Sequence, residues 1–260
     1  MRIRATVVAA LSGALALSAL AAPAAQADEL HGNTKISNVV VNGGKAVVVG
    51  PTTAKKVTVT FTATDNSGID WAQLLLYRGA NIEESESGAV ADSKDGLATC
   101  TKVNATTSNC KTTFTLKPQE NLINSVAGTW KVWAIVAAKD YDFVQKDNAK
   151  SFKVQRASKL TVNASPEPVK KGKTITVTGK LTRANWETGK YAAYTKQSVK
   201  LQFKKKGAST YTTVKTITTD SKGNLKTTVK ASVDGSYRYS FAGNTPTPAV
   251  NSAGDFIDVK

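Results

Sequence analysis

The sequence predicts an all-β protein that contains two tandem antiparallel β-sandwich domains. Three observations support this prediction. Apolar and polar residues alternate along many short segments, turn-forming residues separate these segments, and no stretch has the periodicity of a long helix. The chain has 260 residues, which leaves about 100 to 130 residues for each sandwich after a short leader.

The N-terminal residues 1–27 have the features of a secretory signal peptide. Arg2 and Arg4 precede an apolar run over residues 5–22, and the small residues of the Ala-Gln-Ala segment at 25–27 suit a cleavage site. An uncleaved membrane anchor is the alternative, but the run is short for a span of about 20 residues. We therefore expect a secreted, extracellular protein with no membrane span in the mature chain, either released or held at the cell envelope by contacts rather than covalently.

After a short N-terminal tail at residues 28–35, residues 36–157 are expected to form the first sandwich. Its clearest strand signal lies at residues 57–64, where Val, Phe and Ala alternate with Thr. Residues 71–78, 129–140 and 149–156 carry further strand signals. The only segment with a helical character is residues 118–125, which predicts a single turn.

Cys100 and Cys110 are the two cysteines of the chain. They flank a turn-like segment between two Thr-rich arms, so a hairpin would bring the two sulfur atoms together. Export makes a disulfide the expected outcome. A metal site or a reactive pair is the alternative, and the absence of a nearby histidine or second cysteine pair weighs against it.

Residues 158–260 are expected to form the second sandwich. Ile175, Val177 and Leu181 share one face of a predicted strand, and Val199 and Leu201 share one face of the next. Glycine-containing turns separate these segments. The boundary falls near residue 157, and its lack of a Gly/Pro-rich spacer predicts restricted freedom between the domains.

The second domain resembles the bacterial Ig-like repeat modules of secreted and surface proteins. The residues that carry the resemblance are VKKGKTITVTG at 169–179, VKLQF at 199–203, GNLKTTV at 223–229 and GSYRYSFAG at 235–243. The resemblance implies an Ig-like or fibronectin-like sandwich and a role as a spacer, adhesive unit or accessory domain. It transfers no catalytic residue, and a shared fold says little about function. The first domain resembles these modules more weakly.

The positive charge is concentrated in the second domain. Residues 28–157 hold 15 basic and 13 acidic residues, whereas residues 158–260 hold 18 basic and 6 acidic residues, a net charge of +12. Lys204, Lys205 and Lys206 form one cluster. A unit of this charge attracts polyanions such as teichoic acid, anionic lipid or nucleic acid. Solubility alone is the alternative explanation.

The segment at residues 184–197 is predicted to be a long loop and a candidate binding site. Aromatic rings can stack on sugars or bases, and lysines can contact phosphate. The alternative is that a ring folds back and caps the open end of the sandwich. The candidate residues are Trp186, Tyr191, Tyr194, Lys190 and Lys196.

A Ca²⁺ site is the remaining candidate, and it is the only cofactor that the sequence suggests. Two loops that lie at the same end of an Ig-like sandwich hold Asp65 and Asp70, and Asp140 and Asp142. The alternative is a set of turn aspartates that bond their own backbone.

The sequence offers little for catalysis. His31 is the single histidine, which excludes Ser-His-Asp chemistry away from the N-terminal tail and any multi-histidine zinc site. We therefore expect a non-enzymatic, monomeric protein that binds cell-wall glycan or another polyanion. A purely structural or protein-interaction module is the alternative.

Overall fold

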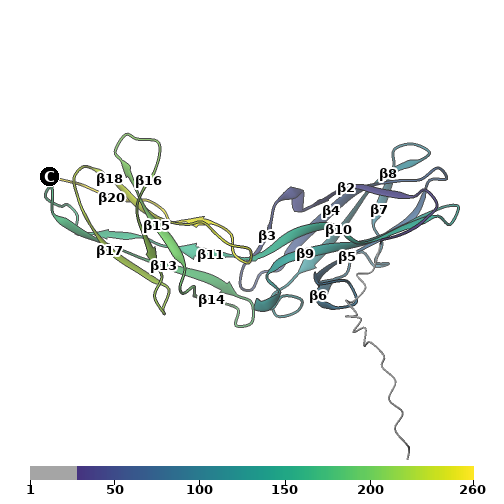
Figure 1. Ribbon diagram of the computed structural model, residues 1–260, viewed down its shortest axis with the longest axis horizontal. Coiled ribbons are helices and arrows are strands. Elements are labelled where there is room, and N and C mark those ends of the chain that lie inside the picture. The colour runs from purple at the N-terminus through teal and green to yellow at the C-terminus, as the bar shows by residue number, and fades with distance from the viewer. Residues whose placement is uncertain (1–27) are drawn as a thin grey trace, which may run out of the picture.

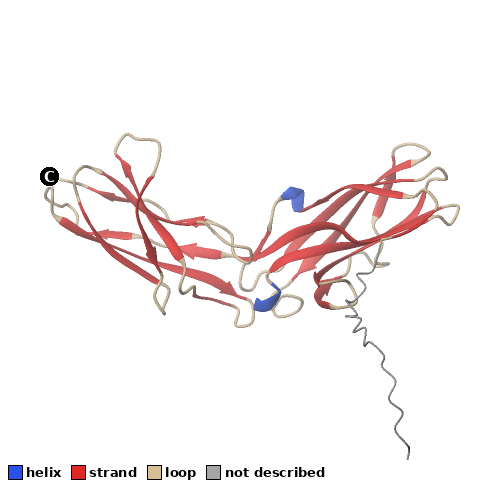
Figure 2. Ribbon diagram, viewed as in Figure 1, coloured by secondary structure: helices blue, strands red, loops and turns tan. Residues whose placement is uncertain are grey.

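The computed structural model describes residues 28–260, so the predicted signal peptide lies outside the described residues. The described chain forms two elongated lobes of strands, joined near their ends (Figures 1 and 2). Two short 3-10 turns, η1 (Asn42–Gly44) and η2 (Asn124–Val126), are its only helical elements. The prediction of an all-β protein is confirmed.

The first lobe consists of two sheets. One sheet has the order β2 (Lys35–Val41), β4 (Lys55–Thr64), β8 (Thr107–Leu116) and β7 (Thr99–Lys102). The other has the order β1 (Glu29–His31), β10 (Phe143–Arg156), β9 (Gly128–Ala138), β5 (Ile69–Gly79) and β6 (Ser85–Ala89). In this second sheet, β3 (Val47–Val49) also pairs with β10, in parallel.

This strand order identifies the first lobe as Ig-like. Labelled in chain order without β1, β3 and β6, the strands of one sheet are A, B, E and D, and those of the other include C, F and G, which is the immunoglobulin arrangement. The usual disulfide between strands B and F is absent from the described residues. A disulfide between strands D and E takes its place, because Cys100 on β7 pairs directly with Cys110 on β8. The predicted disulfide is therefore confirmed.

The second lobe also consists of two sheets. In one, β13 (Thr174–Asn185) is flanked by β11 (Ser158–Leu160) and β12 (Asn163–Ser165) on one side and by β17 (Asn224–Lys230) on the other. Its far end pairs with β14 (Lys190–Ala193). The other has the order β16 (Thr212–Thr218), β15 (Ser198–Lys205), β18 (Gly235–Phe241) and β19 (Val250–Asn251), with β20 (Asp255–Ile257) also on β18.

Alternating apolar residues build the core of each lobe, as the sequence predicts. On β4, Val57, Val59 and Phe61 are buried between the sheets while the intervening threonines face outward. On β13, Ile175, Val177 and Leu181 are buried in the core of the second lobe. The period of two is what places one side of each strand in the core.

Gly179 in the core of the second lobe cannot be replaced by a larger residue without a clash, because other atoms lie close to its backbone. A Cβ atom at Gly179 would lie 2.3 Å from the carbonyl oxygen of Thr161 and 2.7 Å from the ring of Tyr239. The absence of a side chain at Gly179 lets the Tyr239 ring lie close to β13. Its hydroxyl then donates a hydrogen bond of 2.9 Å to the carbonyl oxygen of Val177.

Two local expectations differ from the structure. The segment 28–35, expected to be a tail, contains β1, which pairs antiparallel with the edge of β10 and stacks His31 on Phe143. The segment 184–197, expected to be a loop, begins as a hairpin, because β13 continues to Asn185 and a short turn leads into β14. The division into domains between residues 157 and 158 stays a prediction.

Candidate functional site

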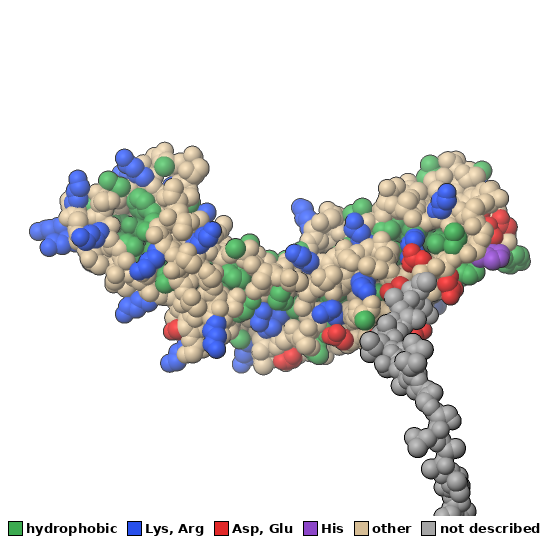
Figure 3. Space-filling view, in the orientation of Figure 1, with side chains coloured by type: hydrophobic (Ala, Val, Ile, Leu, Met, Phe, Trp, Pro, Cys, Tyr) green, Lys and Arg blue, Asp and Glu red, His purple; other side chains and the backbone are tan. Residues whose placement is uncertain are grey.

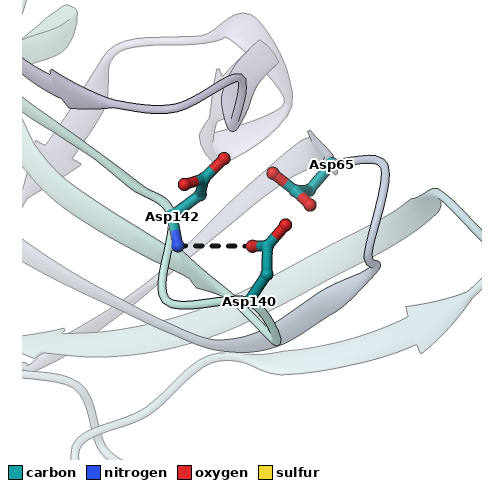
Figure 4. A group of neighbouring side chains, drawn as sticks. All are labelled: Asp65, Asp140 and Asp142. Atoms are coloured by element: carbon teal, nitrogen blue, oxygen red, sulfur yellow. Dashed lines mark hydrogen bonds between the residues drawn. The ribbon is translucent and has the colours of Figure 1, made fainter.

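Three of the four predicted calcium ligands lie together at one end of the first lobe (Figure 4). Asp65 follows directly after β4, and Asp140 and Asp142 lie in the turn between β9 and β10. One carboxylate oxygen from each lies within 4.8 Å of the other two. Asp70 does not join them, because β5 begins at Ile69 and places Asp70 on the exposed strand.

Asp65 is the buried member of this aspartate cluster. Its side chain accepts hydrogen bonds from Thr34 Oγ1 at 2.8 Å, from Ser67 N at 2.8 Å and from Ser67 Oγ at 2.7 Å. Burial alone would raise the pKa of its carboxyl group, but these hydrogen bonds outweigh burial and hold the pKa below its ordinary value. Asp65 therefore carries a negative charge next to two other carboxylates.

The other two carboxylates also have hydrogen-bond partners. Asp140 Oδ1 accepts a bond from Asp142 N at 3.3 Å, and Asp142 Oδ2 accepts one from Asn33 N at 3.0 Å. His31 Nδ1 lies 3.3 Å from Asp142 Oδ1. The described structure thus fits both open alternatives: three convergent oxygen ligands for a cation, and aspartates that bond the backbone of their own turns.

The aromatic candidates of the second lobe are packed rather than presented to solvent. Trp186 has no exposed surface, belongs to the hydrophobic core of the first lobe and donates from Nε1 to the carbonyl oxygen of Val49 at 3.3 Å. Tyr194 is buried and lies at right angles to Phe241, with ring centroids 5.6 Å apart. Tyr191 is half-buried beneath Lys159, whose Nζ lies 4.1 Å from the ring centre.

This placement leaves neither Trp186 nor Tyr194 free to stack on a ligand, and Tyr191 is partly covered. Only Lys190 and Lys196 of the five predicted binding residues are exposed. The alternative role, that of packing, describes Trp186 and Tyr194 better. Trp186, however, packs against the neighbouring lobe rather than its own, and the sequence did not indicate this.

A short polar network surrounds the Trp186 contact. Asn124 of η2 donates from Nδ2 to Asn185 Oδ1 at 2.9 Å and to Glu187 Oε2 at 2.7 Å. Its Oδ1 accepts a bond from Trp186 N at 3.0 Å. The turn between β13 and β14 is therefore tied to the first lobe on both sides of the indole.

Arg156 lies at the same junction. It ends β10, is buried, and donates from Nε to the carbonyl oxygen of Ala184 at 2.6 Å. Burial, together with the nearby positive charge of Arg183, lowers its pKa to about 10. Gln155 adds two bonds of 3.0 Å to the carbonyl oxygens of Asn244 and Thr245. These contacts join the lobes directly, without a free linker.

Basic side chains are spread over the second lobe, while acidic side chains are more frequent on the first (Figure 3). The predicted lysine cluster lies at the end of β15 and in the following turn. Lys204 lies over the Tyr211 ring at 5.2 Å, and Lys206 forms an ion pair with Asp234 at 3.3 Å. Lys205 is exposed. Two of the three cations therefore already have partners within the lobe.

Comparisons with known proteins add little about function. Residues 41–136 match the model of a family of unknown function, DUF5707. No curated protein matches the chain. Among the described residues, no helix is long and apolar enough to cross a membrane.

Several solved structures are similar to the chain at low identity. The D00–D0 domain of intimin is 12% identical, with a TM-score of 0.28, over 86% of this chain and 99% of that one. A chimeric titin Z1Z2 is 10% identical, with a TM-score of 0.26, over 91% and 98%. The ectodomain of the teleost fish polymeric Ig receptor is 12% identical, with a TM-score of 0.25, over 87% and 98%. At these scores, the strand order of the first lobe is what identifies the fold.

Proposed function

We propose that this chain is a secreted, non-enzymatic binding protein that associates with polyanionic material of the cell envelope or the extracellular space. The observation that carries the proposal is the net charge of +12 on residues 158–260, against +2 on residues 28–157. A field of this strength raises the local concentration of anionic polymers and speeds their encounter. The disulfide between Cys100 and Cys110 supports export, because such bonds persist in oxidising compartments.

The test uses the full chain rather than the isolated second lobe. Residues 158–260 alone would expose Trp186, whose packing partners belong to the first lobe. The mature chain is applied to immobilised heparin and to purified cell walls at low salt, and is then eluted with a salt gradient. Salt-dependent retention is the expected result. Flow-through at low salt on both supports would exclude the proposal.

A purely structural or protein-interaction role is the second candidate. The lobes are held together by Trp186, Asn124 and Arg156, so the chain can act as a spacer of fixed geometry. Small-angle scattering on the mature chain tests this role. A single elongated shape that does not change with salt supports it, whereas a broad distribution of distances between the lobes would contradict it.

A Ca²⁺ site at the aspartate cluster is a further candidate within the first lobe. The convergence of Asp65, Asp140 and Asp142 favours it, since oxygen ligands are those that Ca²⁺ prefers. Thermal unfolding with and without calcium tests it, with the Asp140→Asn variant as the control. A rise in melting temperature that the variant lacks supports the site, and no rise at millimolar calcium rejects it.

A further inference from the structure

The strands β12, β13 and β17 place lysines and hydroxyl or amide groups on the outer face of their sheet. The carboxylate of Asp220, in the turn before β17, borders this face and accepts a hydrogen bond of 3.1 Å from Asn224 Nδ2. In the pairing register, Thr174 faces Lys230, Thr178 faces Lys226 and Lys180 faces Asn224. These side chains point away from the core, since the intervening residues of both strands are the buried ones. The residues of this lysine–threonine face are Asn163, Ser165, Thr174, Thr176, Thr178, Lys180, Asn224, Lys226, Thr228 and Lys230.

The three lysines of this face have no side-chain partner within the described residues. Lys180, Lys226 and Lys230 are exposed, and only their backbone groups take part in the hydrogen bonds of the sheet. Because no described carboxylate forms an ion pair with these lysines, their ammonium groups are open to a ligand. Two more lysines, Lys171 and Lys173, lie in the turn at the end of the face. This turn is held beside Lys230 by two backbone hydrogen bonds, from Gly172 N to Ala231 O and from Ala231 N to Lys173 O.

On the opposite sheet of the same lobe, several cationic side chains do have partners within the protein. Arg238 on β18 donates from Nε to Gln202 Oε1 at 2.8 Å and lies over the Tyr211 ring at 3.9 Å. Lys204 contacts the same ring, and Lys206 pairs with Asp234. Several cations of that sheet are therefore already engaged within the protein, so the two faces are not equivalent as anion-binding surfaces.

We propose that the lysine–threonine face binds a linear polyol phosphate, a phosphodiester polymer whose repeating units also carry hydroxyl groups. This inference rests on the proposed function and names its surface and ligand class. Diagonal neighbours on paired strands lie about 7–8 Å apart, which is the relation of Lys180 to Lys226. Point charges at such intervals suit successive phosphates, and the Thr, Ser and Asn side chains between them can exchange hydrogen bonds with the hydroxyls of the polymer.

The composition of the face argues against nucleic acid as its ligand. Single-stranded nucleic acid is held largely by stacking of bases on aromatic rings, and the face has no aromatic residue. Selective recognition of phosphate in a fixed geometry favours the planar fork of arginine, whereas the cations here are all lysines. A flexible polymer of phosphates and hydroxyl groups matches the lysines and the Thr, Ser and Asn side chains of this face.

The test compares two triple variants of the full mature chain that remove the same charge. The first is Lys180→Gln, Lys226→Gln and Lys230→Gln. The matched control, Lys200→Gln, Lys205→Gln and Lys215→Gln, removes three exposed lysines of the opposite sheet. Circular dichroism and melting temperatures establish that both variants are folded. Binding to immobilised poly(glycerol phosphate) is then measured at about 50 mM and about 200 mM salt.

The first variant is expected to lose at least about tenfold in affinity at the lower salt and to lower the slope of log affinity against log salt by about 2. The control is expected to stay within about threefold of the wild type, which reflects the smaller effect of net charge alone. An equal loss in both variants would overturn the assignment to this face but leave the proposed function intact. No salt-dependent binding of any polyanion by the wild type would overturn both.

Two further polymers test the ligand class. Single-stranded DNA of matched charge is expected to bind more weakly than poly(glycerol phosphate), and tighter binding of the DNA would overturn the choice of a polyol. Inorganic polyphosphate lacks hydroxyl groups and is likewise expected to bind more weakly at equal charge. Equal affinity for polyphosphate would show that the hydroxyl groups contribute nothing and would refute that part of the proposal.

Discussion

Replacing Trp186 by alanine is expected to destabilise the protein strongly, although the residue lies in a hairpin turn. The side chain is fully buried in the core of the first lobe, and its indole nitrogen bonds to the carbonyl oxygen of Val49. Truncation of a buried tryptophan costs about 3–5 kcal/mol through lost burial and the cavity left behind. In a protein of this size, that loss corresponds to a fall of roughly 6–20 °C in melting temperature.

Urea and thermal unfolding followed by far-ultraviolet circular dichroism measure this loss. Trp71→Ala is the matched control, because Trp71 on β5 is exposed and its truncation is expected to cost less than about 1 kcal/mol. If Trp186→Ala costs less than about 1 kcal/mol, the packing described for the junction is wrong. If the variant also loses binding to glycan or cell walls at unchanged stability, Trp186 is a ligand-binding residue after all.

Three further outcomes follow from the structure. The Cys100→Ser, Cys110→Ser double variant is expected to lose about 2–3 kcal/mol of unfolding free energy, since the disulfide closes a loop with a sequence separation of 10. A urea midpoint equal to that of the wild type would contradict this prediction. Gly179→Ala is expected to lose about 1–3 kcal/mol of unfolding free energy, because its Cβ would meet Thr161 O and the Tyr239 ring. Gly172→Ala is the comparison, since Gly172 has open space around it but a positive φ of 79°. A larger loss of unfolding free energy at Gly172 than at Gly179 would contradict the packing argument. Because the pKa of Asp65 is lowered in the folded protein, its charged form stabilises the fold. This stabilisation is complete above the ordinary carboxyl pKa and is lost as the pH falls through the lowered value. Asp65→Asn is therefore expected to reduce the loss of unfolding free energy at acid pH, and an acid pH dependence equal to that of the wild type would refute this role.

The strands of both cores could be predicted because their signal is local. On β4, the alternation of Val57, Val59 and Phe61 with threonine defines the buried face without any knowledge of the rest of the chain. The Cys100–Cys110 pair was predictable for the same reason, since a hairpin alone brings the two residues together. The convergence of Asp65 with Asp140 and Asp142 needed only the rule that certain sandwich loops share one end.

The parts that could not be predicted depend on distant contacts. Trp186 is buried by residues of the first lobe, and its hydrogen-bond partner Val49 is 137 positions away. No local pattern distinguishes such a tryptophan from one that is exposed for binding. Asp70 was assigned to a loop because the start of β5 could not be located to within one or two residues. β1 was missed because three residues that pair with a sheet edge leave almost no periodicity.

The difference between the two faces of the second lobe was likewise invisible in the sequence. Both faces contain basic residues at alternating positions, and the net charge of the lobe does not separate them. Only the contacts of Arg238 and Lys204 with Tyr211 show that one set of cations is engaged. The sequence thus indicated a basic domain, and the structure supplies the surface on which a ligand can be sought.

The most direct test of this account is a titration of the ¹⁵N-labelled mature protein with poly(glycerol phosphate), followed by amide chemical shifts. The shift changes are expected to concentrate on β12, β13 and β17, around Lys180, Lys226 and Lys230, and to reverse when salt is added. Shifts centred on β15, β16 and β18, or on the first lobe, would contradict it.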